Sequence, residues 1–183
     1  MSELPTSVRD AFARIRVLTL DVDGVLTDGR LYYSADGESL KGFHVHDGLG
    51  LRLLQEQDIK VAVISARDSA ALARRVQDLG IGEHFYPGSK NKLSALEHLL
   101  NRLTLPPEVV AHVGDDLPDV PVMRRVLLPI AVGNAHRFTR AEARHVTAAA
   151  GGQGAIREVA DTLLRAQGRY QSAYEASLAR HLQ

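Results

Sequence analysis

The stretch RVLTLDVDGVLTD, residues 16–28, decides the fold. Its first five residues, Arg16–Leu20, form a continuous run without alternation of apolar and polar side chains, which is typical of a strand in a parallel sheet covered on both faces. The run stops at Asp21, and a second carboxylate follows at Asp23 before Gly24. The stretch therefore predicts a buried strand that carries two acidic residues at its carboxyl end.

The same alternation of short apolar strands and amphipathic helices continues along the chain. Further strands are predicted at Lys60–Ile64, His84–Tyr86, Val109–Val113, Leu127–Val132 and His145–Thr147. The spacing of apolar residues predicts helices at about Gly48–Gln57, Asp68–Leu79, Lys90–Leu103, Leu117–Val126 and Gly154–Arg165. Strands that alternate with helices in this way predict an α/β fold with a doubly wound, mostly parallel sheet.

One segment departs from this alternation. Residues 29–45 hold two strand-like pieces around Asp36-Gly37, and an Asp-Gly pair is a strong hairpin signal, so we expect a β-hairpin that projects from the sheet after the first strand. No repeat or Pro- and Ser-rich linker divides the chain, which predicts a single domain over residues 1–183. Residues from about 168 to 183 are polar and compatible with a helix, and we expect a loosely held, mobile tail there.

Composition excludes several classes of protein. The chain of 183 residues has no cysteine, which rules out disulfide scaffolds, thiolate metal sites and a cysteine nucleophile. Its 22 basic and 22 acidic residues balance and tryptophan is absent, so neither net charge nor stacking aromatics favour nucleic acid as a partner. No window approaches 18 apolar residues and the first residues lack a secretion signal, which predicts a cytoplasmic protein without a membrane partner.

Residues capable of chemistry follow the predicted strands at the point where each strand ends. They are Asp21 and Asp23 after the first strand, Ser65 and Arg67 after the second, Lys92 at the start of the helix after the third, and Asp115, Asp116 and Asp119 after the fourth. In an open α/β sheet, ligands bind beyond the carboxyl ends of the strands, so these side chains are expected to meet at one edge.

A single aspartate after a strand is most often a turn or helix-capping residue. The whole set cannot act in this way, and carboxylates about 4 Å apart repel by roughly 4 kcal/mol at an effective dielectric constant near 20. Such a cluster needs a compensating cation, and oxygen ligands without cysteine favour Mg²⁺.

These residue types indicate phosphoryl transfer. A carboxylate such as Asp21 can form an aspartyl-phosphate, and Asp23 lies two residues on, where it can donate a proton to the leaving oxygen. Ser65 and Lys92 supply a hydrogen-bond donor and a positive charge for the transferred phosphoryl group. Taken alone, Ser65 is more often a turn residue and Lys92 more often a solvated lysine on a helix.

In their order along the chain, these residues resemble the four motifs of the haloacid dehalogenase superfamily. The motifs correspond to residues 21–28 (DVDGVLTD), Ser65, Lys92 and residues 114–119 (GDDLPD). The resemblance implies that Asp21 is the nucleophile and Asp23 the general acid and base. It also implies that Mg²⁺ is held by Asp21, Asp115 and the backbone carbonyl of Asp23.

Further stretches resemble one family within this superfamily, the 3-deoxy-D-manno-octulosonate 8-phosphate phosphatases. They are residues 36–38 (DGE), 41–43 (KGF), 45–48 (VHDG) and 151–158 (GGQGAIRE), and the resemblance extends from about Val17 to Gln167. It implies a homotetramer whose hairpins meet at the centre, and a role in lipopolysaccharide biosynthesis. The absence of a cap domain also follows from spacing, because the 36 residues between Asp28 and Ser65 and the 22 between Lys92 and Asp115 leave no room for one.

The same resemblance implies a substrate site. It comprises Asp23, His44, Val45, His46, Asp47, Gly48, Arg52, Arg67, Arg75 and Lys92. A guanidinium such as that of Arg67 can bind a sugar-acid carboxylate through two parallel hydrogen bonds. Family members often carry Asn and Arg where this chain has His44 and His46, and a zinc site on this pair is disfavoured by the carboxylate cluster elsewhere. For Arg75 the alternative is a solvated helix face, and residues 151–154 are interpreted as a plain loop rather than an anion site.

We therefore expect a Mg²⁺-dependent phosphatase that acts on an acidic sugar phosphate, by resemblance 3-deoxy-D-manno-octulosonate 8-phosphate, through an aspartyl-phosphate on Asp21. One alternative is the same chemistry on a related nine-carbon sugar-acid phosphate. Another is a non-catalytic phospho-receiver domain, which also gathers acids and a lysine on such a sheet but carries its phosphorylated Asp after a later strand. A third is an inactive family member that serves as an assembly subunit, although every motif residue is intact.

Overall fold

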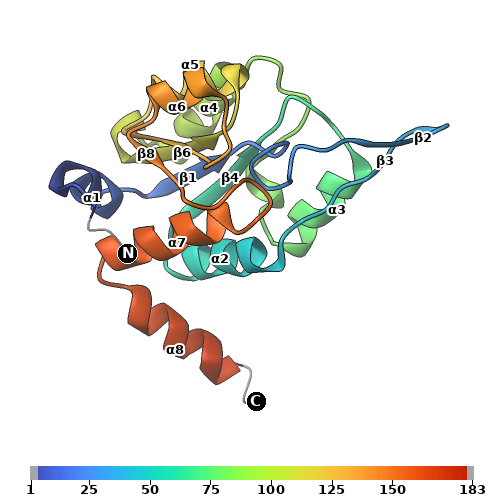
Figure 1. Ribbon diagram of the computed structural model, residues 1–183. Coiled ribbons are helices and arrows are strands. Elements are labelled where there is room, and N and C mark those ends of the chain that lie inside the picture. The colour runs from blue at the N-terminus through green and yellow to red at the C-terminus, as the bar shows by residue number, and fades with distance from the viewer. Residues whose placement is uncertain (1–3, 181–183) are drawn as a thin grey trace.

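A six-stranded parallel sheet lies at the centre of the protein (Figure 1). The structure is a computed structural model, and it describes residues 4–180. Its strand order is β5-β4-β1-β6-β7-β8, and every neighbouring pair is parallel. The strands are β1 (Val17–Leu20), β4 (Lys60–Ile64), β5 (Phe85–Tyr86), β6 (Val110–Gly114), β7 (Leu128–Ala131) and β8 (His145–Val146). The predicted doubly wound α/β fold is confirmed, and the strand from residues 16–28 lies in the middle of the sheet.

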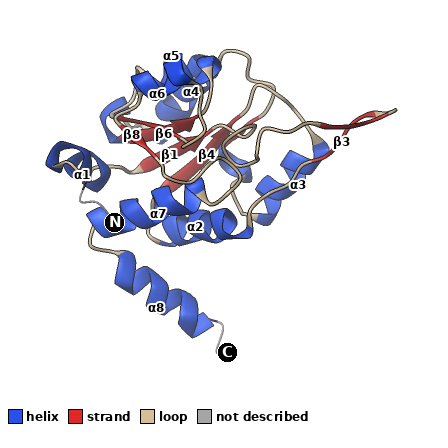
Figure 2. Cartoon of the chain, viewed as in Figure 1, coloured by secondary structure: helices blue, strands red, loops and turns tan. Residues whose placement is uncertain are grey.

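Helices cover both faces of the sheet (Figures 1 and 2). One face carries α1 (Thr6–Ala13), α2 (Val45–Glu56), α3 (Ala70–Asp78) and α7 (Ala155–Ala166). The other carries α4 (Lys92–Leu103), α5 (Val120–Met123) and α6 (Arg137–Glu142). Two cores result, because alternate side chains of a strand point to opposite faces.

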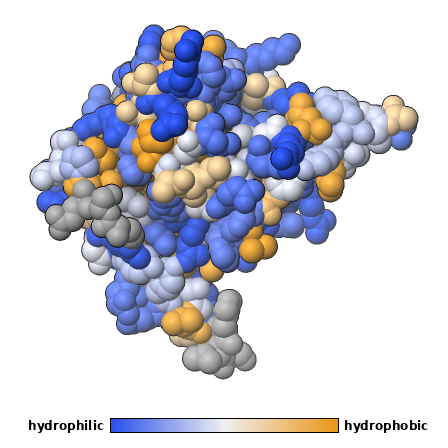
Figure 3. Space-filling model, viewed as in Figure 1, coloured by the Kyte–Doolittle hydropathy of each residue, from blue (hydrophilic) through white to orange (hydrophobic). Residues whose placement is uncertain are grey.

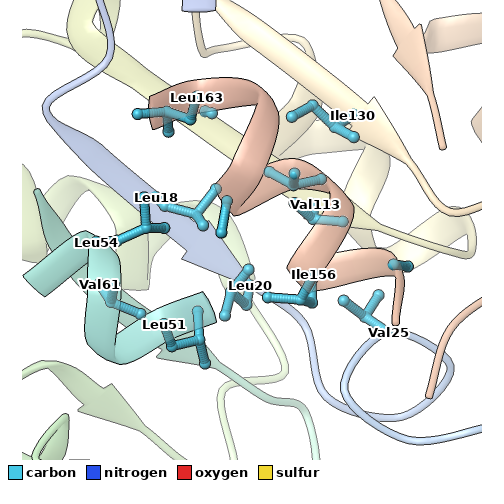
Figure 4. Close-up of a cluster of buried hydrophobic side chains, with 14 of the residues drawn as sticks. Leu18, Leu20, Val25, Leu51, Leu54, Val61, Val113, Ile130, Ile156 and Leu163 are labelled. Atoms are coloured by element: carbon cyan, nitrogen blue, oxygen red, sulfur yellow. The ribbon is translucent and has the colours of Figure 1, made fainter. Parts of the chain in front are cut away.

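Burial follows this alternation along β1. Leu18 and Leu20 are fully buried in the larger core, where they meet side chains of α2 and α7 such as Leu51 and Ile156 (Figure 4). Val17 lies in the smaller core together with Leu96 of α4. The near-continuous apolar run that predicted β1 therefore reflects burial on both faces.

The predicted hairpin is present and extends away from the sheet (Figure 2). It consists of β2 (Tyr32–Ser34) and β3 (Gly37–Leu40), which pair antiparallel. Apolar side chains on and beside it reach the surface, with 42% of Leu31 and 59% of Leu40 exposed, and Figure 3 shows hydrophobic patches at its base. The hairpin therefore presents apolar surface that its own chain does not cover.

Two helices differ from their predicted bounds by three residues or more. α2 begins at Val45, three residues before the prediction, because the His44 side chain accepts a hydrogen bond from the His46 backbone N–H and so caps the helix. The predicted helix at residues 117–126 is wrong in length, since the structure has only a 3₁₀ turn, η3 (Leu117–Asp119), followed by α5. Pro118 and Pro121 lack backbone N–H donors, which limits regular helix there.

Other short elements carried too little periodicity to be predicted. They are α1, α6, and the 3₁₀ turns η1 (Gly82–His84) and η2 (Pro107–Val109). Each is short, and α1 and α6 contribute few buried residues, so their helical pattern is weak in sequence.

The segment for which we expected a loosely held tail forms helix α8 (Tyr170–Arg180). Ala173 of this helix is fully buried, and Arg180 lies 2.8 Å from Glu56 of α2. The last three residues of the expected tail, 181–183, lie outside the described residues. Among residues 4–180, no helix combines the length and the apolar character needed to cross a membrane.

Candidate active site

The carboxyl ends of β4, β1 and β6 are neighbours at the centre of the sheet. The chain leaves β1 for β4 on one side and later reaches β6 on the other, so the strand order changes direction at β1. Ligands bind at such a switch point in open α/β sheets. Ser65, Asp21 and Asp115 directly follow or end these three strands, as predicted.

Lys92 joins two carboxylates at this point. Its Nζ lies 2.7 Å from Asp21 Oδ1 and 2.7 Å from Asp119 Oδ1, and all three side chains are buried. Lys92 is the first residue of α4, which Asn91 caps by accepting a hydrogen bond from Ser94 N–H. Burial by itself would lower the pKa of Lys92, but the two carboxylates raise it above its ordinary value. Lys92 is therefore a fixed ammonium in contact with the predicted nucleophile.

Three carboxylates form the acidic cluster: Asp21, Asp115 and Asp119 each place an oxygen within 4.8 Å of the others. Burial, then the charge of Asp119, raises the pKa of Asp21 to about 6. Burial, then the charges of Asp21 and Asp119, raises the pKa of Asp115 to about 7. The raised pKa values of Asp21 and Asp115 fit a site for a divalent cation, whose charge would favour the ionised forms.

Asp119 differs from the other two because its oxygens already have partners. Oδ1 accepts from Lys92 and lies 3.3 Å from His112 Nε2, and Oδ2 accepts from the backbone N–H of Asp115 at 3.0 Å. Burial would raise the pKa of Asp119, but His112 and then Lys92 hold it below its ordinary value. The side chains that remain for a cation are thus those of Asp21 and Asp115.

Two glycines allow the loops of the site to approach each other. Gly24 has φ +91°, and a Cβ there would lie 2.1 Å from Asp115 Oδ2. A Cβ at Gly151 would lie 1.7 Å from the Gly24 carbonyl oxygen. Residues 151–154 therefore pack on the loop that follows β1, which agrees with the loop interpretation, and any side chain at Gly24 would displace Asp115.

A charged network links Asp23 to the hairpin. Lys41, whose side chain is 1% exposed, donates a short hydrogen bond to Asp23 Oδ1 and lies 2.9 Å from Glu38 Oε1. Arg67 donates to Glu38 Oε2 at 2.9 Å and to the Tyr33 hydroxyl at 2.8 Å. Burial would lower the pKa of Lys41, but Asp23 and Glu38 raise it, and Lys41 in turn lowers the pKa of Glu38.

Lys41 and Glu38 were not among the predicted site residues. Both lie in quoted motif stretches, residues 36–38 and 41–43, but nothing in the sequence alone shows that a lysine 18 positions from Asp23 reaches its carboxylate. The available signal was membership of those motif stretches alone, because the hairpin segment has no more charged residues than the chain as a whole.

Ser65 is buried at the end of β4, the strand next to β1. Its Oγ accepts a hydrogen bond from the Arg67 backbone N–H at 3.2 Å, which fixes the turn that leads to Arg67. Arg67 Nε lies 3.8 Å from Asp23 Oδ2. The structure thus brings Ser65 and Arg67 to the same edge as Asp23.

The start of α2 contributes the other predicted substrate residues. The rings of His44 and His46 meet edge to face at 4.9 Å, and Val45 between them is 73% exposed. Asp47 is buried, and its Oδ1 accepts from Arg157 N–H at 2.8 Å, in the first turn of α7. Burial raises the pKa of Asp47. Its observed role in this conformation is to cap α7.

Arg75 and Arg52 differ in where their side chains lie. The guanidinium of Arg75 lies 5.7 Å from the centre of the Phe43 ring and so close to Gly48 that a Cβ there would contact its Nη2. Arg75 is thus directed toward the start of α2. Arg52 is exposed and donates to the Asp78 carbonyl at the end of α3, so this conformation does not bring it to the other site residues.

Residues 83–158 match the family model for haloacid dehalogenase-like hydrolases. The chain is 49% identical over 164 residues to 3-deoxy-D-manno-octulosonate 8-phosphate phosphatase KdsC of Escherichia coli K12, with 90% of this chain and 87% of that protein covered.

Solved structures of such phosphatases share the fold of this chain. The corresponding phosphatase from Yersinia pestis has a TM-score of 0.89 at 45% identity, covering 92% of this chain and 90% of that chain. The Moraxella catarrhalis phosphatase, in complex with a magnesium ion, a phosphate ion and a KDO molecule, has a TM-score of 0.90 at 37% identity, covering 96% and 99%.

The parallel sheet with an aspartate cluster and a lysine at its carboxyl edge defines a hydrolase of the haloacid dehalogenase superfamily. Within that superfamily, the chain belongs to the family of 3-deoxy-D-manno-octulosonate 8-phosphate phosphatases, which are phosphomonoester hydrolases. The predicted family and enzyme class are confirmed.

Proposed function

We propose that this enzyme hydrolyses 3-deoxy-D-manno-octulosonate 8-phosphate to the free sugar acid and inorganic phosphate. The observation that carries the proposal is the contact between Asp21 and Lys92 at the switch point, beside the acidic cluster. The substrate is supported by relatives named as phosphatases of this compound and by the KDO molecule in one of them. The predicted cytoplasmic location and role in lipopolysaccharide synthesis stay predictions.

In the first step, a carboxylate oxygen of Asp21 attacks phosphorus and the bond from phosphorus to the sugar oxygen breaks. Asp23 gives its proton to that oxygen, and an aspartyl-phosphate remains on Asp21. Lys92, in contact with Asp21, supplies a fixed positive charge for the phosphoryl oxygens. Ser65 is placed at the same edge to donate a further hydrogen bond.

In the second step, water attacks phosphorus, Asp23 accepts the proton of that water, and Asp21 is released with inorganic phosphate. The Lys41 ammonium donates to Asp23. This contact holds the Asp23 side chain in place beside the reacting groups.

Asp21 and Asp115 would hold Mg²⁺ through their side chains, with the backbone carbonyl of Asp23 as a third oxygen. When bound, Mg²⁺ supplies positive charge for the phosphate oxygens and orients them for in-line attack. Asp119 stays outside this set because its oxygens hold Lys92, His112 and backbone N–H groups.

The sugar acid would lie between the start of α2 and the hairpin. Arg67 is the best-placed cation for its carboxylate, since it reaches this edge and is held there by Glu38 and Tyr33. Exchange of Glu38 for a substrate carboxylate would keep the guanidinium paired. Arg75 and His44 line the same side of the site.

Exposed apolar residues of the hairpin favour a homotetramer, in which copies of the hairpin cover one another and complete each site. An isolated two-stranded hairpin is marginally stable in water. This one nevertheless exposes Leu31, Tyr32, Tyr33 and Leu40.

Phosphate release from a panel of phosphate esters tests the proposed function. The panel contains 3-deoxy-D-manno-octulosonate 8-phosphate, a nine-carbon sugar-acid phosphate and a simple aryl phosphate, each with Mg²⁺ and with excess chelator. We expect the highest kcat/KM for the eight-carbon substrate and loss of activity in chelator. A higher kcat/KM for the nine-carbon substrate would support the alternative, and absence of hydrolysis of any ester would refute a phosphatase.

A further inference from the structure

A histidine lies in the smaller core, where the other side chains are apolar. His112 is on the central strand β6 and is fully buried, in the layer that contains Val17, Ala62, Leu96, Val110 and Val122. A polar group buried without hydrogen bonds costs roughly 1–3 kcal/mol in protein mutational data, so each nitrogen of this ring needs a partner. Both have one.

One partner lies on each side of the ring. Nε2 lies 3.3 Å from Asp119 Oδ1, and a carboxylate only accepts, so Nε2 donates. Nδ1 lies 2.9 Å from the hydroxyl of Thr19, the residue paired with His112 in the sheet register. The same hydroxyl donates to the Ala111 carbonyl at 3.2 Å, so Thr19 holds one side of the ring and is itself held by the strand. The Nε2–H donation to Asp119 is the same whichever way the hydrogen bond between Thr19 and Nδ1 runs.

The contact with Asp119 connects this histidine to the reacting groups. Asp119 Oδ1 receives both His112 and Lys92, and Lys92 Nζ contacts Asp21. Thr19, His112, Asp119, Lys92 and Asp21 thus form one continuous chain of contacts from the interior of the sheet to the predicted nucleophile. With one oxygen held by His112 and the other by backbone N–H groups, Asp119 has little freedom to rotate.

We propose that His112 is a positioning residue for phosphoryl transfer: it donates to Asp119 and so fixes where Asp119 holds Lys92 against Asp21, while the Thr19 hydroxyl holds the other side of the ring. This rests on the proposed function only through Asp21 and Lys92 and not through the identity of the sugar. The competing interpretation is a core histidine that merely fills space, and the two differ in what removal of the Nε2 donor does.

Paired substitutions at His112 separate these interpretations. His112→Gln keeps an N–H donor near the Nε2 position, whereas His112→Leu removes it and keeps an apolar side chain of similar bulk. Val110→Ala, on the same strand and in the same layer, is the matched control for loss of packing. Each variant is assayed with 3-deoxy-D-manno-octulosonate 8-phosphate and with an aryl phosphate, and its unfolding by urea is measured.

We expect His112→Leu to lower kcat about 10- to 100-fold on both esters with a much smaller change in KM, because misplacement by about 1 Å can cost about 100-fold. His112→Gln should recover most of that loss. Val110→Ala should lose stability but keep kcat within about twofold. Magnesium affinity, measured by calorimetry, should be unchanged in both His112 variants, since Asp119 is not assigned as a ligand. Equal kcat values for the Gln and Leu variants would overturn the proposal.

A spectroscopic measurement keeps the proposal testable if His112→Leu fails to fold. Nitrogen NMR of the imidazole should show a proton on Nε2 of the wild-type ring, since that nitrogen donates to Asp119. Thr19→Val, which removes the contact on the other side of the ring, should lower kcat, while Thr19→Ser stays near wild type. A neutral Nδ1–H ring in the wild type would overturn the proposal. Lack of phosphatase activity in the wild type would refute the proposed function instead. The NMR measurement would still show whether His112 donates to Asp119.

Discussion

The pKa of Asp115 gives a testable dependence of stability on pH. Asp115 has a pKa raised to about 7 in the folded chain, from an ordinary value of 3.8. A carboxyl whose folded-state pKa is raised stabilises the protein below its unfolded pKa, and that contribution is lost as pH rises through the folded pKa. In the absence of metal, ionisation of Asp115 should therefore destabilise the fold between about pH 4 and pH 7.

Asp115→Asn removes this charge. We expect the free energy of unfolding of the metal-free protein to rise by about 2 kcal/mol near pH 8 and to change little near pH 4. Urea unfolding in excess chelator measures it, and calorimetry should show weaker Mg²⁺ binding by the same variant. Asp116→Asn, at the exposed neighbouring position, is the control. A less stable Asp115→Asn protein near pH 8 would contradict the assignment.

Lys41 provides the second residue-level prediction. Its ammonium is buried between Asp23 and Glu38, so Lys41→Met leaves two carboxylates without their shared cation. We expect kcat to fall by about 10- to 100-fold, because Asp23 loses the contact that orients it. Lys60→Met, an exposed lysine at the amino end of β4, should keep wild-type kcat. Steady-state phosphate release measures kcat for both variants. A Lys41→Met enzyme with wild-type kcat would show that Lys41 is not needed to orient Asp23.

The residues that sequence could predict are those defined by position after a strand. Asp21, Ser65 and Asp115 were expected at one edge because parallel strands end together, and the structure places them there. Lys41 and His112 could not be predicted, because their roles depend on which distant side chain they reach. Arg52 was expected near the substrate, but its helix position directs it to the end of α3.

At the scale of elements, the loop after β1 depends on close backbone approach. Gly24 and Gly37 both have positive φ, but a Cβ at Gly24 would overlap Asp115, whereas a Cβ at Gly37 meets nothing within 4 Å. Gly24→Ala should therefore weaken Mg²⁺ binding about tenfold or more, by displacing Asp115. Gly37→Ala shares the backbone strain and should leave Mg²⁺ affinity unchanged. Calorimetry decides this, and equal affinities in the two variants would refute the packing argument.

Element boundaries show which local signals compete with apolar periodicity. The six strands of the main sheet were located to within one residue. For the central strands the reason is that buried strands leave nearly unbroken apolar runs, whereas β5 and β8 at the edges are only partly buried. The start of α2 was missed because its cap is a histidine, and the shortness of α5 because prolines interrupt an otherwise helical pattern.

At the scale of the whole molecule, the hairpin presents a group of apolar side chains that a single copy leaves exposed. Leu31→Glu and Leu40→Glu should convert the proposed tetramer into smaller species, because each places a charge on the surface proposed to lie between hairpins. Tyr33 is a poorer site for this test because its hydroxyl binds Arg67. Light scattering gives the mass.

The same variants test whether neighbours complete each site. They should lose preference for the sugar-acid phosphate over an aryl phosphate while keeping hydrolysis of the aryl phosphate, because the hairpin contributes to the pocket and not to the reacting groups. A wild-type protein that is monomeric with full selectivity would contradict the proposed assembly.

Trapping of the phosphorylated enzyme tests the central claim that Asp21 is the nucleophile at this edge. Enzyme with Mg²⁺ is mixed with 3-deoxy-D-manno-octulosonate 8-phosphate, quenched in acid within one turnover, digested and examined by mass spectrometry, with Asp21→Asn as the control. We predict a phosphoryl group on Asp21 in the wild type and none in Asp21→Asn, which should also release no phosphate. Phosphate release by Asp21→Asn at a rate near wild type, or a phosphoryl group on another residue, would contradict the mechanism.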